Sequence, residues 1–236
     1  VNTPTIVNDG TFRVQNGTTT FNSTSIINNA DMLLEGTISG SATVNFANGL
    51  VNNGTLTFDN TYASATRNLT VNISGGVLDN QGAWNVVQTG AGSSVTVTGS
   101  LDNSGTISID RNMTLTGTGI SHVNQPGGTI TVQEGHTLTV TGTSSSFVND
   151  GTITLSGVSG VSGVTTILDV SGIETFQNNG SIIGIGTVNG TVLGNAPTVG
   201  LSPGIVTING DYHMTLGSEF EVELVGEVPV VGYDVL

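Results

Sequence analysis

The sequence contains no cysteine and very little positive charge, and each absence excludes a class of function. Without cysteine, the chain forms no disulfide and offers no thiolate to a metal or a substrate. Lysine is absent too, and Arg13, Arg67 and Arg111 stand against 17 acidic residues, for a formal net charge of −14. Nucleic acids and anionic membranes both bind basic patches. We therefore expect neither of them as a partner.

Long apolar runs and helix-forming residues are also scarce. The chain has no run of about 18 apolar residues, so we expect no membrane insertion of this segment. Alanine and charged helix formers are few, whereas 35 glycines punctuate the sequence. Charged residues make up only 8% of the chain, so its surface must consist mainly of Thr, Ser, Asn and Gly. A neutral surface rich in hydroxyls and amides suits a secreted protein.

A short phrase recurs along the chain in degraded copies. The clearest copy is FVNDGTITL at 147–155, and others are IVNDGTFRV at 6–14, LVNNGTLTF at 50–58 and LDNSGTISI at 101–109. The glycine of each phrase, or the residue in its place, marks one unit. The markers are Gly10, Ala30, Gly54, Gly82, Gly105, Gly128, Gly151 and Gly180. Three equal intervals of 23 residues in the middle set the period, which indicates a stack of similar units.

Apolar and polar residues alternate inside each unit. Apolar side chains stand two and four residues after the marker, as Ile107 and Ile109 do after Gly105. A second alternating run and a third, shorter apolar stretch complete most units, which predicts three short strands per unit. Such strands bury a face only when each pairs with its equivalent one unit later. The sequence therefore predicts an all-β fold: a right-handed single-stranded parallel β-helix (β-solenoid) over residues 1–190, with about 23 residues per coil.

Asparagine stands two residues before the marker in seven units. These asparagines are Asn8, Asn28, Asn52, Asn80, Asn103, Asn149 and Asn178. Stacked asparagines at a turn hydrogen-bond from coil to coil, and each bond contributes on the order of 1 kcal/mol. In the remaining unit Pro126 holds that position, and we expect the insertion Gln125-Pro126-Gly127 to displace Asn124 from the column. We interpret the column as a structural ladder, with ligand binding as the lesser alternative.

Candidate catalytic groups are few. Arg111 and Glu134 each lie six residues after a marker, so we expect them to form a surface ion pair one coil apart. Asp110, Glu134 and His136 are the best candidates for a catalytic or metal-binding cluster. That cluster keeps a polysaccharide-active β-helix enzyme open as an alternative, because glycosidases use paired carboxylates. The leading expectation is that the chain is not an enzyme.

The three histidines do not have the paired spacing of a metal site. We expect His122, His136 and His213 each to lie on an exposed strand or turn. Acidic residues occur at the turn in some units, such as Asp9 and Asp150, but other units have Ser or Gln at that position. The turns therefore do not form a repeated calcium-binding motif. The sequence therefore predicts no cofactor.

Threonines occupy many positions that the alternation places outward. On the first strand of each unit they are Thr55, Thr57, Thr106, Thr129, Thr131, Thr152 and Thr154, and the second strand adds Thr114, Thr116, Thr137 and Thr139. We interpret the first set as a candidate contact face. A Thr-X-Thr array on a flat solenoid also orders water, so an ice-binding solenoid is a further alternative. Interruptions at 31–33 and 83–85 and the general preference of Thr for exposed strands weigh against it.

The pattern changes after about residue 190. The chain then reads LSPGIVTINGDY at 201–212, GSEFEVEL at 217–224 and GYD at 232–234, with Glu219, Glu221 and Glu223 expected on a solvated face. This series resembles the C-terminal passenger region of bacterial autotransporters and related large secreted β-helical adhesins. The upstream repeats resemble the same passengers. The resemblance implies a segment exported to the outer cell surface or secreted, as an adhesin, aggregation factor or surface fibre.

The resemblance also shapes the expected domain organisation and function. We expect 191–236 to be a C-terminal continuation of the β-helix that is cut in mid-strand, so that the chain is a piece of a longer polypeptide. The leading hypothesis is a non-catalytic β-helical stalk or binding segment of a secreted bacterial surface adhesin. Its expected partners are glycans, host or neighbouring cell surfaces, or further copies of itself.

Overall fold

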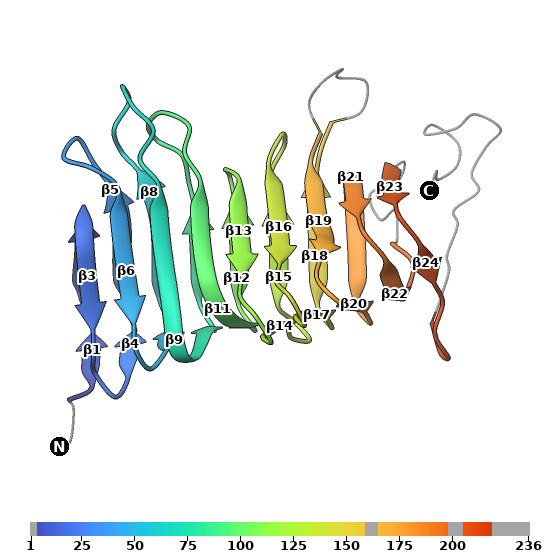
Figure 1. The fold of residues 1–236 in the computed structure, drawn as a ribbon, viewed down its shortest axis with the longest axis horizontal. Coiled ribbons are helices and arrows are strands. Elements are labelled where there is room, and N and C mark those ends of the chain that lie inside the picture. The colour runs from blue at the N-terminus through green and yellow to red at the C-terminus, as the bar shows by residue number, and fades with distance from the viewer. Residues whose placement is uncertain (1–3, 159–164, 198–204, 219–236) are drawn as a thin grey trace.

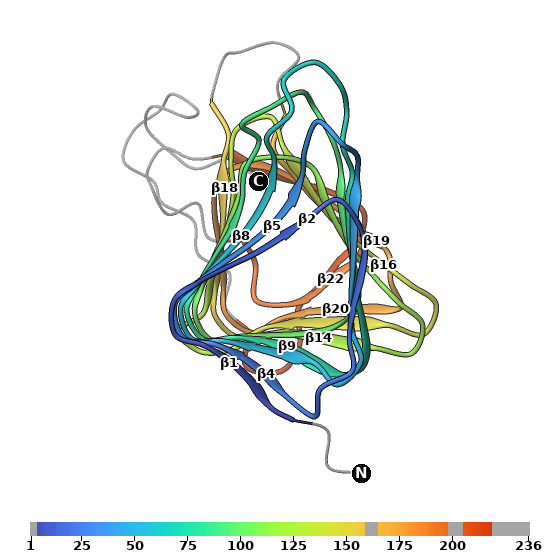
Figure 2. The ribbon, with the colours of Figure 1, turned by 90° about the vertical axis from the view of Figure 1, so that its left-hand side faces the viewer.

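The computed structural model describes residues 4–158, 165–197 and 205–218. Within these ranges the chain forms β-strands and no helix. The strands stack side by side into one elongated parallel β-helix (Figure 1). Each strand pairs in parallel with its equivalent in the next coil, as Ile107 does with Ile130 and Ile130 with Ile153. Seen from the amino-terminal end, the chain turns clockwise as it recedes, which is right-handed (Figure 2). The predicted fold is confirmed.

The strands lie on three faces, and a complete coil contributes one strand to each face. The first face consists of β1 (Ile6–Asn8), β4 (Ile26–Asn28), β7 (Leu50–Asn52), the ends of β9 (Leu69–Asn80) and β11 (Val95–Asn103), β14 (Ser121–Asn124), β17 (Ser146–Asn149), β20 (Thr175–Asn178), β22 (Val192–Gly194) and β24 (Tyr212–His213). The second face consists of β2 (Thr11–Gln15), β5 (Asp31–Gly36), β8 (Thr55–Asn60), β10 (Ala83–Val86), β12 (Thr106–Ile109), β15 (Thr129–Val132), β18 (Thr152–Ser156) and the start of β21 (Ser181–Asn189). The third face consists of β3 (Gly17–Phe21), β6 (Ala42–Phe46), the starts of β9 and β11, β13 (Met113–Thr116), β16 (Thr137–Thr141), β19 (Ile167–Gly172), the end of β21 and β23 (Ile205–Asn209).

The core is a set of inward columns in which each residue stacks on its equivalent in the next coil. The alternation predicted these positions, and Leu56, Phe58, Ile107 and Ile109 are all buried. Aromatic residues stack in the same way: Phe21 and Phe46 are in register, and their ring centroids lie 5.3 Å apart. Burial of one such side chain stabilises the fold by about 1.5–3 kcal/mol. Because every coil repeats the pattern, the core runs continuously along the described chain.

The predicted asparagine ladder runs along the corner between the first and second faces. Each side-chain amide donates to the Oδ1 atom of the asparagine in the next coil, over 2.6–2.7 Å. The same amide also donates to backbone carbonyls, as Asn28 does to Ala30 and Thr55. The backbone carbonyl of Asn28 in turn accepts from the amides of two residues in the next coil. The buried polar groups of this corner are therefore satisfied by cross-coil bonds.

The predicted displacement of Asn124 is wrong. Its amide accepts from Asn103 and donates to Asn149, both over 2.7 Å, so the ladder has eight members. The inserted residues 125–127 form a turn between Asn124 and the marker Gly128, closed by a hydrogen bond from Gly128 N to Gln125 O. The bonds of the ladder are buried, whereas a turn on the surface tolerates additional residues. The insertion is therefore absorbed in the turn, and the ladder keeps its register.

The marker glycine is required by the close approach of neighbouring coils. A Cβ atom added at Gly105 would lie 2.1 Å from the carbonyl oxygen of Gly82, and one added at Gly82 would lie 2.1 Å from that of Gly54. The first marker, Gly10, has no atom within 4 Å of the same position. The repeat of glycine therefore reflects the packing of one turn on another.

We expect Gly105→Ala to lower the free energy of unfolding by about 1–3 kcal/mol, because the added methyl group would push two backbones apart. The matched control is Gly10→Ala, for which we expect a change within about 0.5 kcal/mol. Urea unfolding followed by circular dichroism measures both. Equal effects of the two substitutions would contradict this account of the turn.

Candidate functional site

The titratable residues singled out in the sequence lie at the corner between the second and third faces. His136 Nε2 lies 3.4 Å from Asp110 Oδ1 of the preceding coil, so the structure brings these two together. The side chain of Asp110 is 58% exposed, and Glu134 is exposed. Within the described ranges, Glu134 forms no ion pair and no group of three or more His, Asp or Glu side chains is placed to hold a metal ion. The corner therefore presents a solvated pair of side chains.

The predicted surface pair of Arg111 with Glu134 is wrong. Arg111 is fully buried, and its guanidinium donates to the backbone oxygens of Val87, over 3.1 Å, and Ser94, over 3.4 Å. Burial lowers the pKa of Arg111 to about 10, against the opposing effect of the Asp59 charge, and at that value it is still a cation at neutral pH. Residue 111 is two positions beyond the inward Ile109, so the alternation simply continues. Counting from the apolar column would have found this inward position.

The carboxylate of Asp59 is also buried at this corner and is fully engaged. It accepts from Thr89 N over 3.1 Å, from Thr89 Oγ1 over 2.6 Å and from Asn60 N over 2.6 Å. A buried charge is costly unless it is paired or hydrogen-bonded, and these bonds meet that requirement. Asp59 and Arg111 therefore tie the corner together and are not presented to a substrate.

His122 is buried, contrary to the predicted exposed position. It stands in the inward column of the first face, in register with Phe147, and the two rings meet edge-on with centroids 6.4 Å apart. Neither ring nitrogen has a hydrogen-bond partner, and burial lowers the pKa of His122 to about 4. The expectation holds for His213, which is exposed, whereas His136 is half-buried. The sequence contains the signal for this inward position, because His122 lies two residues before Asn124 just as Phe147 lies two residues before Asn149.

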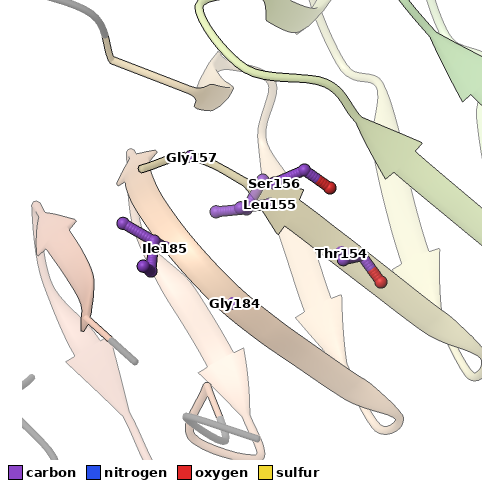
Figure 3. A pocket seen from close by; sticks show the side chains of 6 residues that line it. All are labelled: Thr154, Leu155, Ser156, Gly157, Gly184 and Ile185. Atoms are coloured by element: carbon purple, nitrogen blue, oxygen red, sulfur yellow. The ribbon is translucent and has the colours of Figure 1, made fainter. Parts of the chain in front are cut away.

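A small pocket opens between the end of β18 and the middle of β21 (Figure 3). Its volume is about 230 Å³, and its lining consists of Thr154, Leu155, Ser156, Gly157, Gly184 and Ile185. Leu155 and Ile185 supply the apolar wall. None of the lining side chains titrates, so the lining supplies no acid, base or charged nucleophile.

The predicted contact face is the outward side of the second face. Thr55, Ala83, Thr106, Thr129 and Thr152 stand in register along it. The second row reads Thr57, Asn85, Ser108, Thr131 and Thr154. The threonines point outward as predicted, and Ala83 and Asn85 interrupt both rows. Towards the amino terminus the rows continue with Asp31 and Leu33, so the face is neither uniform nor neutral.

The third face carries a longer array than the sequence suggested, and we call it the threonine face. Its first row reads Thr18, Thr43, Thr70, Thr96, Thr114 and Thr139, in six consecutive coils. Its second row reads Thr20, Asn45, Asn72, Thr98, Thr116 and Thr141. The turn between the second and third faces varies in length, so equivalent threonines lie at different distances from the glycine marker of their coil. Positions counted from that marker therefore do not align these rows. Counting outward from the buried column of Val44, Val71 and Val97 would have aligned them.

The acidic turn residues hold neighbouring amides. Asp9 accepts from Asn29 Nδ2 and Asp150 accepts from Asn179 Nδ2, each over 2.8 Å. These bonds form short outer rows beside the buried ladder. The geometry thus explains the acids as hydrogen-bond acceptors for the next coil.

Comparisons with protein-family models, with curated proteins and with solved structures each gave no match. In the part of the chain that the structure describes, no helix has the length and hydropathy needed to cross a membrane.

We expect the buried His122 to make stability depend on pH. Its folded pKa of about 4 lies below its ordinary value of 6.5, so the unfolded chain binds the additional proton between these values. The folded state is therefore most stable above about pH 6.5, where His122 is neutral in both states, and it loses stability as the pH falls towards 4. We expect the free energy of unfolding to fall by about 2 kcal/mol between pH 7 and pH 5. Urea unfolding at both pH values measures it. His122→Phe continues the aromatic column and should lose this pH dependence; an equal dependence in both proteins would refute the burial of a neutral imidazole.

Proposed function

We propose that the chain is a non-catalytic β-helical stalk or binding segment of a secreted bacterial surface adhesin. The observation that carries the proposal is the continuity of the solenoid: three parallel sheets, one core and one asparagine ladder run through consecutive coils. At about 4.8 Å per coil, eight coils span roughly 40 Å. A rod of this kind sets a fixed distance between what lies at its two ends.

The outward positions support a binding role built from repetition. A second-face row offers a similar hydroxyl in several successive coils, as Thr106, Thr129 and Thr152 do. A repeating partner, such as a glycan chain, meets equivalent groups in each coil, and weak contacts that are linked in this way add up to useful avidity. The rigid backbone keeps the entropy lost on binding small, because the groups are already ordered.

The exposed chemistry agrees better with contact than with catalysis. Among the described residues, Asp110 pairs with the half-buried His136, and this two-membered pair lies on a solvated corner. The other unusual titratable groups, Arg111 and His122, are buried inside the coils. The resemblance of the repeats and of 201–234 to autotransporter passengers supports a location outside the cell.

A glycan array and a bead-aggregation assay with the purified chain test this proposal. We expect binding to glycans or clustering of coated beads, reduced several-fold by Thr131→Lys, because the lysine would disturb the middle of the second face. Val148→Lys makes the same change on the first face and should leave binding unchanged.

Three results would count against the proposal. Silence in both assays would leave no binding role, and equal losses from the two lysine variants would remove the second face as the contact surface. Release of reducing sugar from bound polysaccharide, abolished by Asp110→Asn, would favour the polysaccharide-active alternative instead.

A further inference from the structure

The threonine face has a fixed two-dimensional repeat. Adjacent threonines of one row are spaced by one coil, about 4.8 Å, and the two rows are separated by two residues along each strand, about 6.6 Å. Figure 1 shows the strands that carry the rows, β3, β6, β9, β11, β13 and β16, lying side by side in one surface. The branched side chain of Thr is stiff at χ1, so its methyl and hydroxyl groups repeat with the backbone.

The hydroxyls of the first row are free to bond to solvent. Among the described residues, no hydrogen bond involves the side chains of Thr43, Thr70, Thr96, Thr114 or Thr139. In the second row, the amides are fixed along the row: Asn45 donates to Thr20 Oγ1 over 3.0 Å, and Asn72 donates to Asn45 Oδ1 over 2.8 Å. The array is therefore ordered before a partner binds. Its first-row hydroxyls form no hydrogen bond within the described chain and are available to that partner.

The chemistry of the face also restricts what the partner is. All positions of both rows are neutral in a chain of net charge −14, and the first acidic group of the first row, Asp169, follows Thr139. Both rows consist of Thr and Asn alone, so they offer no charge to pair with an ionic ligand. Small methyl and hydroxyl groups at a regular spacing are suited to water molecules held at that same spacing.

We propose that the threonine face binds ice. The repeats along and across its rows are close to the oxygen repeats on the faces of hexagonal ice, so water held between the rows is already placed as in the crystal. The methyl groups keep disordered water out of the troughs, while the hydroxyls hydrogen-bond the ordered layer. Six coils in register make the match cooperative, because each additional coil adds equivalent contacts without a new ordering cost.

Thermal hysteresis and partitioning of the fluorescently labelled chain into a growing ice crystal test this proposal. The wild-type chain should shape ice and separate the freezing point from the melting point. Thr114→Tyr places a large ring in the middle of the first row, and we expect it to reduce both signals several-fold. Tyr is well accepted in exposed strands, so the fold should remain intact, which a melting curve verifies.

The control variant lies in the same coil on another face. Thr106→Tyr makes the same chemical change on the second face and should leave ice binding unchanged. Thr96→Tyr repeats the test one coil away, in case Thr114→Tyr fails to fold. Absence of ice shaping by the wild-type chain at high concentration would overturn the proposal, as would equal losses from Thr106→Tyr and Thr114→Tyr. Glycan binding that is lost in Thr114→Tyr, without any effect on ice, would assign the face to a sugar partner.

Discussion

Seven hydrogen bonds between asparagine side chains join coil to coil along one corner of the β-helix, and the register of the whole fold depends on them. Parallel strands slip by one residue only if every side chain exchanges its inward and outward position. A primary amide is both donor and acceptor, so one residue type repeats the same bond indefinitely. The corner is buried, and a missing member would leave its neighbours unsatisfied. The ladder thus fixes which residues of each coil face the core.

The ladder explains why the coils tolerate insertions elsewhere. The turn between the second and third faces varies freely in length, and even the ladder corner accommodates the insertion 125–127 without losing Asn124. Once the register is fixed, polar residues at inward positions must find partners inside. Arg111 does so through backbone oxygens, whereas His122 has no such partner and remains neutral beside the ring of Phe147. The outward rows, including the threonine face, are a consequence of the same register.

Much of the fold could be predicted because its signals are local. The period-2 alternation and the recurring Asn-X-Gly gave the three strands, the inward columns and seven of the eight ladder positions. Two of the errors arose where an insertion or a turn of variable length interrupts the linear count. The insertion 125–127 hid the ladder position of Asn124, and the variable turn between the second and third faces hid most of the first row of the threonine face. His122 and Arg111 were also placed outside, although both continue the inward alternation. Hydrogen bonds between coils determine which residues of two neighbouring coils lie opposite one another. These bonds cannot be read from the spacing of residues along the chain.

We infer that the buried cross-coil bonds of the asparagine corner, rather than polar contacts in general, hold the coils in register. The most direct measurement compares Asn103→Ala with Asn53→Ala by urea unfolding. Asn103 lies inside the ladder, whereas Asn53 makes a similar bond to Asn29 in an exposed outer row, over 2.9 Å. We expect the free energy of unfolding to fall by about 2 kcal/mol or more for Asn103→Ala and by less than about 1 kcal/mol for Asn53→Ala. Equal small losses would contradict it.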